Sequence, residues 1–355
     1  MASSIARPAY AARSASLSLS GELRRAYELR KQLLAIAEEK QDATLLTWAH
    51  SFALIPCAMG EFTSARSHLE RAISLYDPAR SEVYRTVYSV IDPGVVSLGW
   101  SAITLCLLGC PDRALERSRQ SLALARALAH PFSFALALGR SAQFHLLRRE
   151  AEDSLSSANE CLRVATEHGF EQMSAWAAVH RGMSLVELHQ PKDSIVQLQD
   201  DVAAARATGY EFGLTYSLAA LGKGYAKVGR VADGLASLAE GLVVSERNGE
   251  RWFDAELYRI RGELLLEQDA HAEWKEESEA ESSFRQALDI ARAQEARWWE
   301  LRTTVSLARV LAKQGRHDEA RTMLAEIYNW FTEGFDTADL KDAKALLDEL
   351  SEHKN

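Results

Sequence analysis

Small residues recur along this chain at an almost constant spacing, and this repetition constrains the fold more than any other feature. Between residues 114 and 234 a small side chain stands every 40 residues, and the series continues on both sides. Its members are Ala26, Ala65, Ala114, Ser154, Ser194, Gly234, Ala280 and Ala320. A period of about 20 to 50 residues indicates similar structural units stacked on one another.

The clearest unit, residues 214–242, predicts the structure of each repeat. The spacing W-x2-L-G-x2-Y and then A-x3-F is matched here, with Leu for Trp and Gly for Ala, by Leu218, Leu221, Gly222, Tyr225, Gly234 and Leu238. This spacing is the helix–turn–helix signature of a tetratricopeptide repeat. Small residues at 222 and 234 let two helices cross closely, and Gly229 predicts the turn between them.

We therefore predict an all-α fold, a tetratricopeptide-repeat solenoid of about eight helical hairpins wound into a right-handed superhelix. The first hairpin is expected to be incomplete, and the two longer steps in the series place insertions at residues 77–94 and 267–279. A C-terminal capping helix is expected at 336–351, with Asp336 as its N-cap. Because a solenoid buries its core between neighbouring repeats, we expect one elongated domain over residues 1–355, with 1–10 frayed.

Charge and composition restrict the partners. Residues 1–150 carry a formal charge of +5 and residues 151–355 one of −14, so the acidic half should repel nucleic acid. No run of 18 apolar residues occurs, so no membrane span is expected. The four cysteines stand in apolar surroundings, which is typical of reduced core thiols in the cytoplasm. A mitochondrial-type leader is the weaker alternative for the Ala/Ser/Arg-rich N-terminus.

Motifs for catalysis, cofactors or metals are not found. The chain has no Gly-rich phosphate loop, no GxSxG and no HExxH, and no His or Cys pair has a second pair to complete a zinc site. His145 and His189 are expected to be packing or surface histidines. We therefore predict a chain that is not an enzyme and that uses no cofactor and no metal.

The concave groove is then the candidate site. In a solenoid of this class the first helix of each hairpin lines the groove, and counting from the packing positions selects its exposed side chains. These are His50, Gln143, Trp176, His180, Tyr216, Lys223, Arg259, Glu263, Arg302 and Arg309. Cations beside aromatic rings suit a peptide or a small anionic metabolite. The alternative is that many of them only solubilise the surface or form interhelical ion pairs.

Several stretches together resemble one protein family. They include IDPGVV, AHPFS, AELYRIRGELLL and WFTEGFDTADL, and the resemblance covers roughly residues 20–350. The chain resembles the C-terminal tetratricopeptide region of large bacterial regulators that join a class III adenylate/guanylate cyclase or a DNA-binding domain to a signal-transduction ATPase. No cyclase or nucleotide-binding motif is present here, so the catalytic activity of such proteins does not carry over.

The resemblance implies a non-catalytic scaffold that binds a peptide, a partner protein or a small metabolite and relays the event to an ATPase or cyclase module. The alternative is the sensor domain of a peptide- or small-molecule-responsive transcription regulator, and an enzyme would require clustered perturbed acids or histidines in the groove. We expect a protein or peptide partner and no direct contact with nucleic acid or membrane. The sequence leaves the oligomeric state open.

Overall fold

A computed structural model describes residues 17, 20–87, 91–188, 191–207, 209, 211–268 and 278–352. The described part is all-α, as predicted, with one short 3-10 helix, η1. The elements are α2 (Leu23–Lys40), α3 (Ala43–Ser51), α4 (Leu54–Ala58), α5 (Phe62–Leu75), η1 (Pro78–Arg80), α6 (Ser81–Val87), α7 (Pro93–Leu107), α8 (Pro111–Ala127), α9 (Pro131–Leu147), α10 (Ala151–Glu167), α11 (Glu171–Glu187), α12 (Pro191–Ala207), α13 (Leu214–Lys227), α14 (Val231–Asn248), α15 (Asp254–Gln268), α16 (Glu279–Ala293), α17 (Arg297–Lys313), α18 (His317–Trp330) and α19 (Ala338–Glu352).

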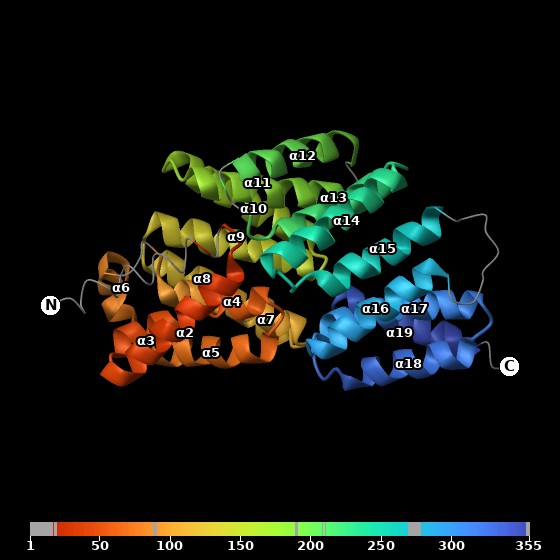
Figure 1. Ribbon diagram of the computed structural model, residues 1–355, viewed down its shortest axis with the longest axis horizontal. Helices are drawn as coiled ribbons and strands as arrows, with labels where there is room; N and C mark the ends of the chain where they lie inside the picture. Colours follow the sequence, from red (N-terminus) through yellow and green to blue (C-terminus); the bar gives the residue numbers. More distant parts are fainter. Residues whose placement is uncertain are drawn as a thin grey trace.

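Consecutive helices pair as hairpins from α7 to α18, and α3 with α5 forms one more (Figure 1). The pair α13–α14 shows why small residues repeat. A Cβ at Gly222 would lie 3.0 Å from Leu238 Cδ2, and one at Gly234 would lie 2.9 Å from the Gly222 carbonyl oxygen. The backbones therefore meet at this crossing, which confirms the role predicted for Gly222 and Gly234.

The described part of the first insertion, residues 77–87 and 91–94, is anchored to the neighbouring helices by Asp92. Asp92 is the N-cap of α7 and accepts hydrogen bonds from the Gly94 and Val95 amides at 2.9 and 3.1 Å. Its second oxygen accepts from Tyr76 and Ser81, so one buried carboxylate ties α6 and α7 to the end of α5. The second insertion, 267–279, falls largely on residues 269–277, which lie outside the described residues.

Two local predictions differ from the structure. The first helix of the second hairpin is broken into α3 and α4. In a continuous helix the ring of Pro56 would clash with the carbonyl of Phe52, and proline has no N–H to donate to that carbonyl. The final helix begins at Ala338, not at Asp336. The Thr337 carbonyl accepts its first hydrogen bond, from the Lys341 amide at 3.1 Å, so Asp336 is not the N-cap.

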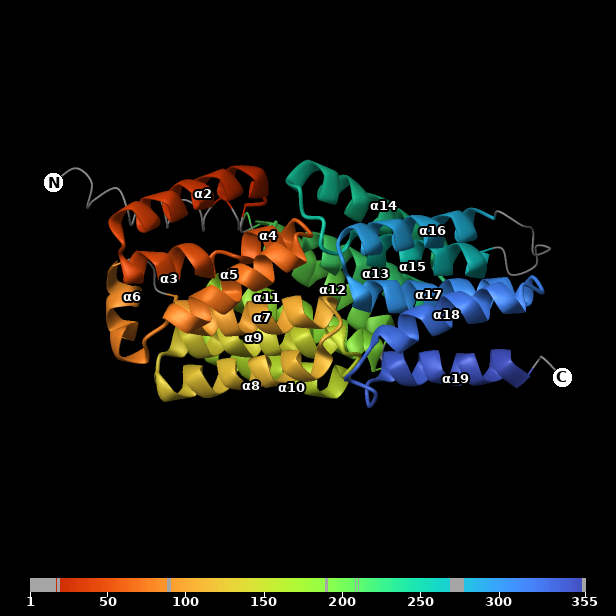
Figure 2. The ribbon, with the colours of Figure 1, turned by 90° about the horizontal axis from the view of Figure 1, so that it is seen from below.

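The row of repeats curls until distant repeats meet (Figures 1 and 2). The Arg251 and Trp252 amides both donate to the Ala58 carbonyl, at 2.8 and 3.0 Å. At a second junction, Glu333 accepts from the Asp112 and Arg113 amides at 3.1 and 3.2 Å. The chain exposes 15402 Å², close to the roughly 14,000 Å² typical of a compact monomer of this mass. The helical repeats are therefore present as predicted, but they form a compact closed ring, so the expectation of an elongated shape with an open groove is wrong.

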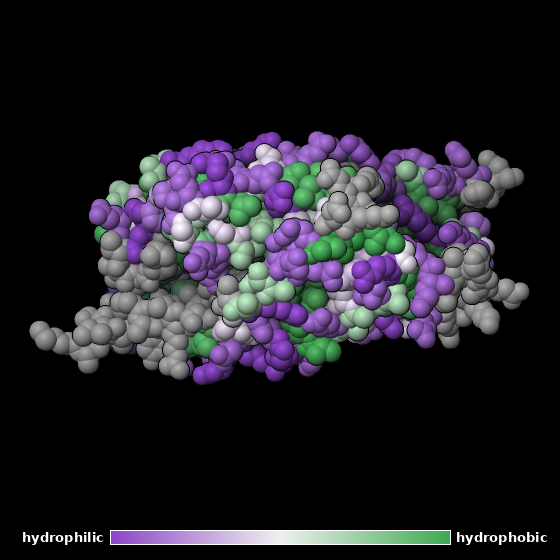
Figure 3. Space-filling view, turned by 90° about the horizontal axis from the view of Figure 1, so that it is seen from above, coloured by the Kyte–Doolittle hydropathy of each residue, from purple (hydrophilic) through white to green (hydrophobic). Residues whose placement is uncertain are grey.

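Closure gives one large core cluster, whose members run from Leu23 to Leu350. The face seen in Figure 3 carries mostly hydrophilic residues, with smaller hydrophobic patches between them. The most exposed large apolar side chains of the described residues are Val83, Val196, Val243, Trp330 and Phe335. None of the described helices combines the length and the hydrophobicity that crossing a bilayer requires.

Candidate functional site

A large cleft among the described residues lies between α9, α10, α11, α13, α15, α17 and α19. Its volume is about 750 Å³. Charged side chains dominate its lining, with eight carboxylates and six basic groups. The carboxylates are Glu150, Glu152, Asp153, Glu187, Glu256, Glu263, Asp339 and Asp342, and the basic residues are Arg149, Lys223, Lys227, Arg259, Arg302 and Arg309.

Half of the predicted groove residues line this cleft. They are Lys223, Arg259, Glu263, Arg302 and Arg309, which come from three successive first helices, α13, α15 and α17. Counting from the packing positions succeeds here because the first helices of neighbouring hairpins lie side by side, so equivalent positions face the same space.

Arg302 is the centre of an ion-pair network across the cleft floor. Its guanidinium binds Asp339 of α19 through two hydrogen bonds of 2.9 Å and approaches Glu256 at 3.5 Å. It also donates to the Leu147 carbonyl at the end of α9. Arg259 binds Glu256 at 2.6 and 2.8 Å. These groups therefore join three parts of the closed ring, and their charges are largely compensated before any ligand arrives.

A second ion-pair group lies on the neighbouring wall. Glu187 accepts from Lys223 and Lys227 at 2.8 and 2.9 Å. Burial alone would raise the pKa of Glu187, but the two ammonium groups lower it to about 2. Glu256 behaves in the same way, because Arg259 and Arg302 outweigh its burial and bring its pKa to about 2. Both acids therefore remain carboxylates at neutral pH and are unsuited to proton donation.

Arg309 differs from the other basic residues of the cleft. Its side chain is exposed, and within the described part of the chain it forms no ion pair or hydrogen bond. Glu152 and Asp153, at the start of α10, also line the cleft and are exposed. The rim thus presents both signs of charge that the protein itself does not compensate.

The remaining predicted residues are not part of an exposed groove. Gln143, Trp176, His180 and Tyr216 are between 1% and 9% exposed, because closure of the ring covers the inner faces of α9, α11 and α13. His50 lies apart from the cleft, on α3, where its Nδ1 stands 2.9 Å from that of His68. The expectation of a single exposed strip of ten residues is therefore wrong.

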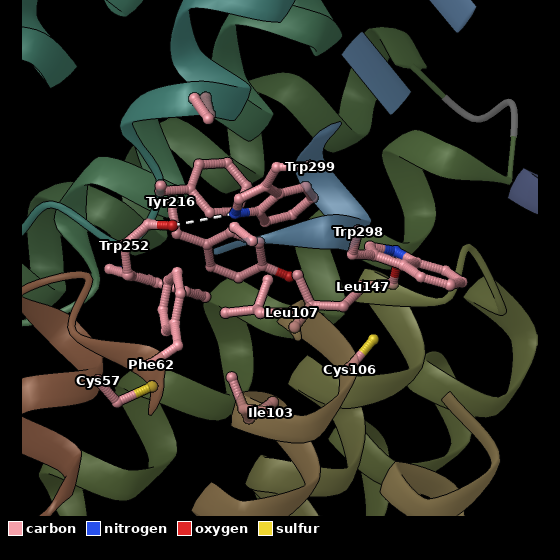
Figure 4. Close-up of a cluster of buried hydrophobic side chains, with 14 of the residues drawn as sticks. Cys57, Phe62, Ile103, Cys106, Leu107, Leu147, Tyr216, Trp252, Trp298 and Trp299 are labelled. Carbon is pink, nitrogen blue, oxygen red and sulfur yellow. Dashed lines mark hydrogen bonds between the residues drawn. The ribbon is translucent and has the colours of Figure 1, made fainter. Parts of the chain in front are cut away.

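Trp176, His180 and Tyr216 belong to a continuous row of buried aromatic rings next to the cleft. Ring centroids are separated by 4.8 Å between Trp176 and His180, 5.9 Å between His180 and Tyr216, and 5.0 Å between Tyr216 and Phe253. Trp299 continues the row at 5.2 Å from Phe253. Figure 4 shows Tyr216 beside Trp252 and Trp299, whose indole nitrogen donates to the Trp252 carbonyl at 3.0 Å. The inner aromatic residues therefore belong to the core of the closed ring.

One cluster near the cleft has the composition of a metal site. His145, Glu150 and Asp153 bring one ligand atom each within 4.8 Å of one another. Glu150 already binds His145 at 2.6 Å and the buried Arg148 guanidinium at 2.8 Å. That guanidinium occupies the position beside the carboxylate where a cation would bind, so these residues are poorly suited to a metal ion.

Paired helices, small residues at the crossings and a concave interior define the class: the chain has a tetratricopeptide-like helical repeat fold. Among solved structures it is similar to a Rap protein complexed with competence and sporulation factor, with a TM-score of 0.60, 9% identity and 98% of both chains covered. It is also similar to NprR in complex with its cognate peptide NprX, with a TM-score of 0.52, 10% identity and coverage of 97% and 99%.

Comparison of the sequence gives a higher identity over a shorter part of the chain. No family model matches the chain. A curated relative is the uncharacterized protein R02095 of Rhizobium meliloti (strain 1021), which is 24% identical over 282 residues. The match covers 77% of this chain and 26% of that protein, so the chain spans about a quarter of the length of its relative.

Proposed function

We propose that this chain is a non-catalytic binding module that holds an extended peptide segment in the charged cleft. The observation that carries the proposal is the cleft itself, about 750 Å³ in volume and lined by residues from α9 to α19. A space that crosses several helices suits a chain-like ligand, and exposed groups of both signs suit a peptide with mixed charges. The two structures of similar fold support this proposal, since one is a complex with competence and sporulation factor and the other a complex with a peptide.

A small anionic metabolite is the less favoured ligand. Lys223, Lys227, Arg259 and Arg302 already bind protein carboxylates, so an anion would have to compete with these partners. Carboxylates also outnumber basic groups around the cleft. An anion with no compensating positive charge would therefore bind an acidic surface unfavourably.

The proposal that the chain is not an enzyme rests on the same network. Glu187, which is partly buried, and Glu256, which is buried, are held as carboxylates by their basic neighbours. General acid–base catalysis at neutral pH needs a group that titrates near neutrality, and these two do not.

Affinity selection from a random hexapeptide library, read by mass spectrometry, tests the proposed function. We expect the protein to enrich a family of peptides whose binding weakens as salt is raised, because exposed charges on the rim are screened. Arg309→Ala should weaken a selected peptide several-fold, since exposed ion pairs contribute roughly 0.2–1 kcal/mol.

Arg119→Ala is the matched control, because Arg119 is exposed on α8 and outside the cleft. It should bind the selected peptide like the parent. Failure to enrich any peptide would contradict the proposed function, and equal losses in the two variants would contradict the proposed place of binding.

The relay of binding to another module is a further part of this proposal. The resemblance to regulators with an ATPase and a cyclase supports it, and so does the length of R02095, of which this chain matches about a quarter. The sensor region of a transcription regulator remains the alternative, supported by the fold similarity to NprR. Native mass spectrometry of the protein purified from its host separates these by the identity of whatever co-purifies.

A further inference from the structure

A side pocket extends the cleft towards the aromatic row. Its volume is about 50 Å³, and it shares Glu187, Lys223, Glu256 and Arg302 with the main cleft. Deeper in, its walls are apolar and include Met183, Phe253 and Ile260. The side pocket is therefore a narrow apolar recess that opens beneath the ion pairs of the cleft.

One polar group in this recess has no hydrogen-bond partner among the residues that the structure describes. Tyr216 lines the side pocket and is 7% exposed, and its hydroxyl oxygen is buried without a hydrogen bond. Burial raises the pKa of Tyr216, and the nearby charges of Glu187 and Arg302 also act on it. Glu187 and Arg302 both line the side pocket, and neither lines the second small cavity that Tyr216 borders, so the charges that act on the hydroxyl belong to the side pocket. A buried hydroxyl without a partner is unfavourable, so a ligand that supplies one gains affinity.

The charges at the mouth decide which kind of group fits. Glu187 binds Lys223, and Glu256 lies within 3.5 Å of Arg302, so positive and negative groups are equal in number and paired. A charged side chain of the ligand would be buried here without a counter-ion, which is costly. The small volume excludes aromatic and long side chains, and the group must also be able to exchange a hydrogen bond with a phenol.

We propose that the side pocket receives a small uncharged hydroxyl side chain, serine or threonine, of the bound peptide, and that this hydroxyl is hydrogen-bonded to Tyr216 Oη. This inference rests on the proposed peptide binding and adds a preference for one kind of side chain in the peptide. The methyl group of threonine packs against the apolar wall, which favours threonine over serine. A valine of the same shape fills the recess but leaves the phenol without a partner, so the pocket discriminates against it.

The experiment uses the full chain and a random hexapeptide display library. Wild-type protein should select peptides with serine or threonine enriched at one position. A selected peptide and its counterpart with valine at that position are then titrated against wild type and Tyr216→Phe. The wild type should bind the valine peptide about tenfold more weakly, which corresponds to one hydrogen bond. Tyr216→Phe should bind the two peptides within about twofold of each other.

Tyr225→Phe is the matched control, because Tyr225 lies on the same helix, is equally buried and lines none of the cavities described above. It should keep the tenfold preference. Selected peptides without a hydroxyl preference, or an unchanged preference in Tyr216→Phe, would overturn this inference and leave the proposed function in place. Selection of no peptide at all would overturn both.

Discussion

At the scale of single residues, the charged groups of the interior separate into two kinds. Glu256 and Arg302 are almost fully buried and bind each other and their neighbours, so they hold the ring closed. Removing one member of such a pair leaves the other charge buried without a partner, which lowers the free energy of unfolding by roughly 3–5 kcal/mol. A substitution at Arg259 or Arg302 therefore tests stability, and the exposed Arg309 is the better residue for testing binding.

Glu250 is a buried acid that forms no ion pair with a basic side chain among the described residues. Its Oε1 accepts from Trp252 Nε1 at 2.8 Å and from the Gly213 amide and Thr215 hydroxyl at 3.0 Å. Burial, together with the charge of Asp254, outweighs these bonds and raises the pKa of Glu250 to about 7. The folded state then holds a proton between pH 4.5 and 7 that the unfolded state has released. The free energy of unfolding must fall as pH rises through this window.

We expect Glu250→Gln to remove most of that pH dependence. The amide keeps an oxygen for the three donors but cannot ionise. The parent should lose roughly 2–3 kcal/mol of stability between pH 5 and 8, and Glu250→Gln should retain most of it. Denaturant midpoints measured from pH 5 to 8 provide the test. Glu171→Gln, at an exposed position on α11, should follow the parent. Parallel curves for the parent and Glu250→Gln would contradict the prediction.

At the scale of the elements, the repeated small residues set the distance between paired helices. Gly222 and Gly234 bring α13 and α14 into backbone contact. At Gly139 of α9 the neighbour is an aromatic ring, since a Cβ there would lie 1.9 Å from Trp176 Cζ3. The absence of a side chain at these glycines thus lets either the neighbouring helix or a large aromatic ring approach their backbone.

Gly222→Leu should therefore destabilise the protein. The new side chain would meet Leu238 and the Gly234 carbonyl, and overpacking of this kind costs roughly 1–3 kcal/mol. Thermal melting followed by circular dichroism measures the loss. Ala236→Leu adds the same side chain at an exposed position of α14 and should melt close to the parent. If both variants melt alike, the close crossing does not limit this pair of helices.

At the scale of the whole molecule, closure of the ring makes α19 more than a cap. Leu340, Leu346 and Leu350 are buried, and Asp339 binds Arg302 and Arg149 across the cleft. The last helix therefore completes the apolar core and one wall of the candidate site at the same time. The junctions at Ala58 and Glu333 hold distant repeats in the arrangement that forms the cleft.

Truncation after Gly334 should lower the melting temperature much more than removal of residues 1–10. Each large apolar side chain removed from the core costs roughly 1.5–3 kcal/mol of stability, and the truncated chain also loses Asp339, one of the partners of Arg302. Differential scanning calorimetry of the two shortened chains compares these losses. Equal melting temperatures would show that α19 is dispensable for the fold.

The sequence by itself determined the repeat. A small residue every 40 positions and the spacing of Leu218, Gly222 and Tyr225 predict paired helices, because these are local rules of helix crossing. The same counting selected Lys223, Arg259, Glu263, Arg302 and Arg309 for one surface, since equivalent positions of stacked helices face the same space. Whether they bind a ligand stays a prediction.

Only the tertiary structure decided the curvature. Small differences in packing between successive repeats add up along the solenoid, and no single repeat encodes their sum. That sum brings Ala58 to Trp252 and buries Trp176, His180 and Tyr216, which the sequence pattern alone placed in an exposed groove. It also pairs Arg302 with Asp339, 37 residues further along the chain. Partners that meet only when the ring closes leave no periodic signal in the sequence, so the cleft and its side pocket could not be derived from it.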